Sequence, residues 1–213
     1  MVHCSGITVE DSALGYGHGG FEAFSSGVTV RNCTFVCGGV SHIVFRNENR
    51  AKVRLEDNIF VDLLNMKGGN PIVLIHAPDF FTERNNCFFV RMPWPERRVY
   101  GWNLQNGNPA EKNVAEARKF PFLGRRQVPY SVFVKEFKRE NTSFAADPKI
   151  KLIPGFLVTY TSYDQWSKNW RKNQNKSYRE YWRLKEQDRL EFGNYLPRDP
   201  EVLRRGCGPR VGK

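Results

Sequence analysis

Residues 28–35 read Val-Thr-Val-Arg-Asn-Cys-Thr-Phe, and residues 53–60 read Val-Arg-Leu-Glu-Asp-Asn-Ile-Phe. Related phrases begin at Ile7 and Phe81, so the four copies are separated by 21, 25 and 28 residues. Each copy alternates apolar with polar residues, has Asp or Asn at its fifth position, and ends on Leu or Phe. Recurrence at such a period is typical of a solenoid, and alternation with period two predicts strands.

The repeat predicts a chain that makes one turn per copy, with each strand parallel to its equivalent in the next turn. Val28 and Phe35 should then point inward and pack on Val53 and Phe60. A tight bend is expected at Asn32-Cys33, Asp57-Asn58 and Asn85-Asn86, because Asn and Asp tolerate the left-handed backbone that a corner needs. The alternative is an antiparallel β-sandwich in which the four phrases align by chance.

The phrase resembles the repeat of the right-handed parallel β-helix superfamily, which includes pectate-lyase-like and other polysaccharide-active proteins. The resemblance covers roughly residues 5–105 and returns near the end of the chain. It implies an all-β protein with about four to five coils and a C-terminal helical and loop extension packed on them. It indicates a fold superfamily and does not specify a reaction.

Three regions follow from this pattern. Residues 1–105 are expected to form the coils, with second strands within 20–25, 40–46, 71–77 and 99–104. Residues 106–160 should hold a short helix from Asn108 to about Lys119, a strand at Tyr130–Phe137, and an Ala-Asp-Pro turn at 146–148 that resembles the closing turn of a late coil. Residues 161–213 should form a basic two-helix extension, whose helices open with capping boxes at Ser162 and Ser177, and a C-terminal strand and tail.

Composition narrows the class of protein. The absence of any run of 18 apolar residues excludes a membrane-spanning helix, and no signal peptide precedes Ile7. Because the chain opens inside a repeat, it is expected to be the C-terminal portion of a longer protein, or else a short protein whose first coil a partner covers.

The five cysteines lack zinc-site spacing and are expected to be free and buried.

Charge is unevenly distributed along the chain. The net charge is +11, yet residues 1–83 carry −3, while residues 84–139 carry +8 and residues 164–213 carry +6. A basic surface attracts polyanions over a distance, although the same charge would also suit a face that is merely solvated.

The candidate site lies on the second strands, where side chains are expected to project outward at neighbouring turns. An imidazole beside guanidinium groups suits an anionic sugar, and aromatic faces suit stacking on its ring. The predicted catalytic residues are His42, His76 and Arg97. The predicted substrate-binding residues are Arg46, Trp94, Arg98, Tyr100 and Trp102. No metal or cofactor is predicted, and Asp11, Asp57 and Asp62 fall at corners or strand ends.

Three functions stay open. The chain is part of an enzyme that cleaves an anionic polysaccharide as a lyase or glycoside hydrolase, or it is a non-catalytic carbohydrate-binding or structural β-helix. The third and weakest alternative is nucleic-acid binding by the basic C-terminal half, for which no fold signature is present. New chain ends in uronate polymers would separate the first two. The resemblance implies an extracellular or periplasmic location, which the chain itself does not specify.

Overall fold

The computed structural model describes residues 6–17, 21–24, 27–37, 42–46, 51–62, 72–75, 78–90, 100–103, 125–152 and 191–210. This part of the chain is predominantly β, with parallel sheets and few helices. Its strands are β1 (Ile7–Glu10), β2 (Ala13–Gly17), β3 (Phe21–Phe24), β4 (Val28–Arg31), β5 (Thr34–Cys37), β6 (Ile43–Arg46), β7 (Val53–Glu56), β8 (Ile59–Asp62), β9 (Val73–Ile75), β10 (Phe81–Arg84), β11 (Cys87–Val90), β12 (Tyr100–Asn103), β13 (Arg125–Val128) and β14 (Phe144–Ala145). Its helices are the 3-10 helices η1 (Pro78–Phe80) and η5 (Phe192–Tyr195) and the α-helices α2 (Tyr130–Glu136) and α6 (Pro200–Arg204).

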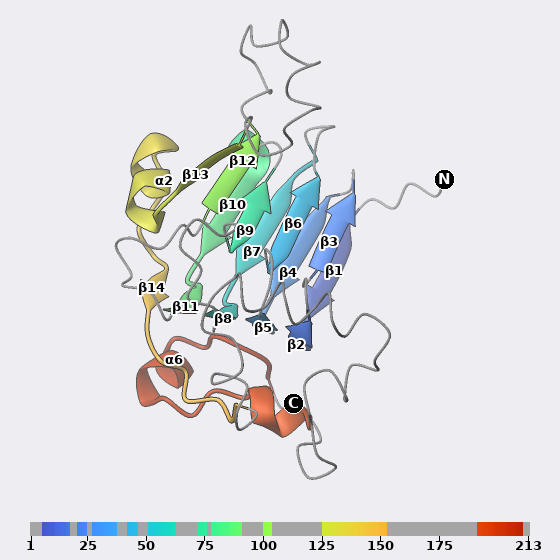
Figure 1. Cartoon of the computed structure of the whole chain (residues 1–213), viewed down its shortest axis with the longest axis vertical. Coiled ribbons are helices and arrows are strands. Elements are labelled where there is room, and N and C mark those ends of the chain that lie inside the picture. Colours follow the sequence, from blue (N-terminus) through green and yellow to red (C-terminus); the bar gives the residue numbers. More distant parts are fainter. Residues whose placement is uncertain are drawn as a thin grey trace, which may run out of the picture.

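The strands form three sheets, which the chain visits in rotation. Sheet A has the order β1-β4-β7-β10, sheet B the order β14-β11-β8-β5-β2, and sheet C the order β13-β12-β9-β6-β3. We call three successive strands, one in each sheet, a round; β1 to β12 make four rounds. The strands of equivalent position lie side by side in sequence order (Figure 1). Every pairing is parallel except that of β13, which runs antiparallel to β12.

The register of sheet A follows the sequence repeat residue for residue. Ile7 pairs with Val28, Val28 with Val53, and Val53 with Phe81. In sheet B the rings of Phe35 and Phe60 stack 5.2 Å apart, with their planes 9° from parallel. The predicted parallel stacking is confirmed, and the antiparallel sandwich is wrong for the described strands.

Each copy of the phrase holds two strands and the corner between them. The fifth residue of the phrase has a positive φ in all four rounds, from 46° at Asp11 to 57° at Asp57. Asp and Asn adopt this left-handed conformation at lower cost than other non-glycine residues, because their side chains bond locally. The predicted corner is therefore confirmed, and it is what passes the chain from sheet A to sheet B.

The next residue of the corner is buried in the second, third and fourth rounds, and in the last two it is an asparagine, Asn58 or Asn86, with no exposed surface. The Asn58 side chain bonds the preceding round, donating from Nδ2 to Val30 O (3.0 Å) and accepting at Oδ1 from Cys33 N (3.0 Å). Asn86 repeats this one round later, with Nδ2 to Leu55 O (3.0 Å) and Oδ1 accepting from Asn58 N (3.1 Å). Asn58 Nδ2 also donates to Asn86 Oδ1 (3.0 Å), so the two amides form a continuous ladder.

A second ladder is aromatic. Phe60 stacks on Phe88 with ring centroids 5.0 Å apart, and Phe88 lies 6.3 Å from the ring of Tyr130 in α2. Phe133, also in α2, is fully buried against Phe81. The helix thus covers the end of the four rounds at this side (Figure 1).

The predicted strand at Tyr130–Phe137 is wrong, because this segment forms α2. Its alternation is real, but the inward residues are Tyr130 and Phe133, with Val134 and Phe137 packed against the core. That spacing belongs to one face of a helix. Val132, which a strand reading would bury, is 39% exposed.

The C-terminal segment lies along the outer face of sheet B (Figure 1). Tyr195 and Val202 pack there with Ile59 and Val61. Gly15 is where Tyr195 approaches most closely, since a Cβ added to Gly15 would stand 2.6 Å from its ring. β14 pairs with β11 as the edge strand of sheet B, and the predicted Ala-Asp-Pro turn at 146–148 follows it directly in the chain.

The end of this segment crosses the corners of all four rounds. Asn85 Nδ2 donates to Arg205 O (2.8 Å), and Asn32 Nδ2 donates to Gly206 O (3.0 Å). Gly208 N donates to Asp57 O (2.8 Å), and Arg210 N donates to Asp11 Oδ1 (2.9 Å). We call residues 205–210 the tail strap.

The predicted C-terminal strand is not found among residues 191–210, which hold η5 and α6. Asp199 is the N-cap of α6, and its Oδ1 accepts from Glu201 N (3.1 Å) and Val202 N (3.3 Å). The predicted helix at 108–119 and the predicted helices that begin at Ser162 and Ser177 lie outside the described residues, apart from Glu191, which precedes η5.

Replacing Asn58 by alanine tests the asparagine ladder. The change removes the side-chain partner of Cys33 N and of Val30 O inside the core, and it removes one of the two hydrogen bonds that Asn86 Oδ1 accepts. The free energy of unfolding should therefore fall by about 2–3 kcal/mol. Chemical denaturation of the two proteins measures this difference.

Ser12→Ala is the matched control, because Ser12 occupies the equivalent corner position in the first round. Its hydroxyl only donates to Glu10 O in an exposed setting. This variant should lose no more than about 0.5 kcal/mol. Equal losses in the two variants would contradict a ladder that stabilises by internal hydrogen bonds.

Candidate functional site

Most of the predicted site residues fall where the structure gives no side chain. His76, Trp94, Arg97 and Arg98 lie outside the described residues. Arg46, Tyr100 and Trp102 are placed through their backbone alone, in β6 and β12. Their proposed roles therefore stay predictions.

His42 is the exception, and its predicted outward orientation is wrong. The side chain is 1% exposed, with Nε2 3.1 Å from Val61 O and its ring edge against Phe60. His42 lies just before β6, and its backbone N–H donates to Ile72 O (2.8 Å), so sheet-like bonding to the next round already begins at this residue. The His42 side chain is therefore buried in the interior, and its catalytic role stays a prediction.

The register of sheet C shows which of the remaining candidates align with buried positions of the sheet. Ile43 and Phe45 are buried in β6, and they pair with Val73 and Ile75, which pair in turn with Tyr100 and Trp102. The backbone of these two aromatics thus belongs to the inward positions of the sheet. Arg46 alternates with Phe45 and pairs with Phe24. Because side chains alternate along a strand, this register is compatible with an outward Arg46, whose orientation stays a prediction.

Sheet A provides the best-described outer face. Four residues at the ends of its strands lie in one row and alternate in charge: Glu10, Arg31, Glu56 and Arg84. Arg31 Nε donates to Glu10 Oε2 (2.6 Å), and the Arg84 guanidinium lies 3.7 Å from Glu56 and 3.5 Å from Asp57. The adjacent outward row is Thr8, Thr29, Arg54 and Thr82.

This row does not resemble a pair of catalytic carboxylates. Acid–base hydrolysis needs two carboxyl groups that face one sugar with their protonation states set apart. Here each glutamate forms an ion pair with an arginine of the neighbouring strand, so the row does not present two carboxyl groups to one sugar. The face presents guanidinium and hydroxyl groups beside these ion pairs.

A second polar cluster, missed by the sequence reasoning, closes the end of the asparagine ladder. Glu83 takes the inward position that Val30 and Leu55 hold in the earlier rounds. Its carboxylate accepts from Tyr130 Oη (2.7 Å), from Asn86 Nδ2 (3.1 Å) and from Ser143 Oγ. The one sign in the sequence is that Glu83 interrupts an apolar column of the repeat.

The cluster joins α2 and the segment before β14 to the last round. Ser143 Oγ accepts from Asn86 N (2.9 Å), and Ser143 N donates to Tyr130 Oη (3.0 Å). The Ser143 hydroxyl is therefore engaged as both donor and acceptor, which suits a structural role more than a nucleophile. Burial and then the Glu83 charge raise the pKa of Tyr130 well above its ordinary value.

The cysteines behave as predicted where they are described. Cys33, Cys87 and Cys207 are free and buried. Burial raises the pKa of the Cys33 thiol to about 11 and that of Cys207 to about 12, which keeps them protonated and unreactive.

The described residues show neither a metal-binding cluster nor a membrane-spanning helix. They contain no group of three His, Cys, Asp or Glu side chains placed to hold a metal ion. Among the same residues no helix is long and apolar enough to cross a membrane.

Comparison with known proteins gives no further constraint: no family model, curated protein or solved structure matches the chain.

Tyr130→Phe tests the end cluster through its pH dependence. An unfolded tyrosine ionises from about pH 10, whereas folded Tyr130 keeps its proton to higher pH. This contribution to stability is therefore complete below pH 10 and is lost as the pH rises toward the folded pKa. Between pH 9 and pH 11, the wild type should lose about 1.4 kcal/mol more than Tyr130→Phe, measured by denaturation at each pH.

At pH 7 the same variant should be less stable than the wild type by about 1–2 kcal/mol, because the Glu83 carboxylate and Ser143 N each lose a partner. Parallel pH profiles for the two proteins would show that the Tyr130 hydroxyl does not depend on the folded environment.

Proposed function

We propose that the four rounds wind as a right-handed parallel β-helix and that the protein engages an anionic polysaccharide. The observation that carries the fold is the rotation of the chain through three parallel sheets, with the repeat phrase in register. The family that the phrase resembles uses such stacks to bring side chains of neighbouring turns onto one polymer. Stacked strands are about 4.8 Å apart, so residues one round apart can contact the same sugar.

The outer face of sheet C is the proposed contact surface. In support, Arg46 follows the buried Phe45 in β6, an alternation that favours an outward side chain, and His76, Arg97 and Arg98 stand next to β9 and β12 in the sequence. Guanidinium groups bind carboxylates in a bidentate manner, which favours a uronate polymer. In a cleaving enzyme, His76 or Arg97 would remove the proton beside the uronate carboxyl group.

Binding without cleavage is the second candidate. The specific observation in its favour is the outer face of sheet A, where both carboxylates of the charged row are neutralised by arginines. A face of this kind presents hydroxyl and guanidinium donors to a ligand and no free acid–base pair.

Incubation with uronate polymers separates the two. Cleavage predicts new unsaturated or reducing ends, and His76→Ala and Arg97→Ala should each lower that rate by on the order of 10²–10⁴-fold. Lys135→Ala, on the exposed side of α2, is the control and should leave the rate unchanged. Normal rates in the His76 and Arg97 variants would remove these residues from the site.

If no ends form, affinity electrophoresis in gels that contain the uronate polymer tests binding. Migration should be retarded in the uronate gel and not in a gel with a neutral glucan. Arg46→Ala should reduce the retardation. Equal migration in both gels would contradict the proposed ligand.

A further inference from the structure

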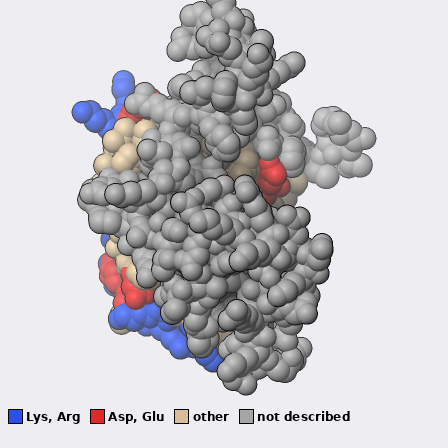
Figure 2. Space-filling model, in the orientation of Figure 1, with Lys and Arg blue, Asp and Glu red and all other residues tan. Residues whose placement is uncertain are grey.

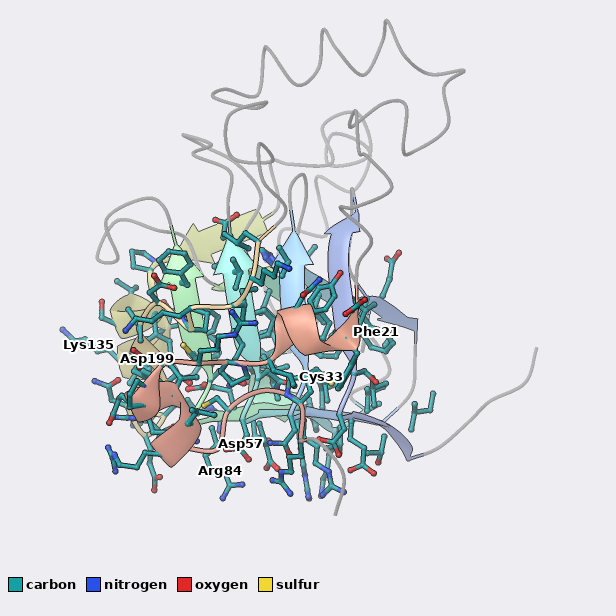
Figure 3. All side chains as sticks on the ribbon, turned by 90° about the horizontal axis from the view of Figure 1, so that it is seen from below. Phe21, Cys33, Asp57, Arg84, Lys135 and Asp199 are labelled. Atoms are coloured by element: carbon teal, nitrogen blue, oxygen red, sulfur yellow. The ribbon has the colours of Figure 1, made fainter. Side chains whose placement is uncertain are left out.

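The charged row of sheet A has an unusual symmetry. Its order Glu10, Arg31, Glu56, Arg84 becomes Arg, Glu, Arg, Glu when read from the other end. A copy turned end to end therefore presents the opposite charge at every position. The row is exposed, with 49% of the Arg31 side chain and 61% of the Arg84 side chain open to solvent. Figure 3 shows Arg84 directed away from the strands, and Lys135 on α2 apart from it.

We propose that the outer face of sheet A binds a second copy of this chain. A two-fold axis along the strand direction, between β4 and β7, brings Glu10 opposite Arg84 of the second copy and Arg31 opposite its Glu56. Each pair occurs twice, as an isologous interface requires. The neighbouring row is compatible, since Thr8 meets Thr82 and Thr29 meets Arg54, so no like charges oppose each other.

The charge balance of the molecule favours this face for self-association. Two copies that each carry a net charge of +11 repel one another overall. The two outward rows of sheet A hold three arginines and two glutamates, a net +1. The copies can therefore approach here against little repulsion. Elsewhere, as around α6, Arg204 and Arg205 outnumber their partner Glu201 (Figure 2).

A polyanion suits this face less well than a second copy does. Glu10 and Glu56 stand between the arginines at each step of the row, and they would oppose the negative groups of a polymer. A second copy supplies cations to both glutamates and anions to both arginines.

The size of the face sets the strength of the dimer. Four strands of four residues cover roughly 19 Å by 13 Å, or about 250 Å² on each copy. This is well below a standard interface, so the dimer should form only at concentrations of about 0.1–1 mM. Because its pairs are partly exposed, about 1 M salt should weaken it.

Reciprocal charge reversal gives the decisive experiment. In a homodimer of Arg31→Glu, the introduced carboxylate faces Glu56 of the second copy, and in a homodimer of Glu56→Arg the introduced guanidinium faces Arg31. Each variant alone should therefore raise the dissociation constant at least about tenfold. An equimolar mixture of the two restores an opposite pair at every position, and it should associate as the wild type does. Analytical ultracentrifugation at about 0.5 mM measures all three samples.

Lys135→Glu is the control, because it makes the same change in charge on α2 and should leave association unchanged. Circular dichroism of each variant establishes that it is folded, and the wild type alone provides a second test. A wild type that stays monomeric at about 1 mM, or a mixture that stays monomeric where the wild type associates, would overturn the proposal. Association that is equally weakened by Lys135→Glu would also overturn it.

Discussion

The structure depends on how the inward corner of each round satisfies its backbone. A chain that turns from one sheet to the next carries N–H and C=O groups into the interior, where an unpaired group costs a few kcal/mol. In the third and fourth rounds Asn58 and Asn86 each satisfy such groups with one side chain, since an amide both donates and accepts. Each amide bonds the round before it, so stacking is specified by polar contacts as well as by the apolar columns. The buried phenylalanines supply area, whereas the asparagines fix the register.

A stack built this way needs an end that stops both ladders. Tyr130 does so with two parts of one side chain, since its ring follows Phe88 and its hydroxyl bonds Glu83. Glu83 and Ser143 then occupy the groups that a further asparagine would have bonded. The end of the stack is therefore closed by side chains from α2 and from the segment before β14, and α2 covers the apolar columns that another round would otherwise cover.

The repeat made sheet register predictable, because Asp11, Asn32, Asp57 and Asn85 mark the same left-handed corner in sequence and in structure. Local alternation was a poorer guide. At Tyr130–Phe137 the apolar residues fit both the two-residue period of a strand and the 3.6-residue period of a helix. The helix forms because it covers the end of the stack, whose residues lie far away in the sequence. His42 shows the same limit, since its burial depends on Val61 O and Phe60 in the next round. Of the candidate site, register places the backbones of Arg46, Tyr100 and Trp102, whereas His76, Trp94, Arg97 and Arg98 lie outside the described residues, so their roles could not be checked.

The tail strap changes how the molecule should come apart. A plain solenoid frays from its ends, because each repeat contacts only its neighbours and can be lost singly. Here Arg210 bonds Asp11 across 199 residues of chain, and Arg205 bonds Asn85 in the last round. Loss of any one round must also release contacts made by the strap, so unfolding is expected to be cooperative. Such long-range contacts form late and slowly, so the tail strap is expected to dock last in folding. Once docked, it opposes the loss of single rounds.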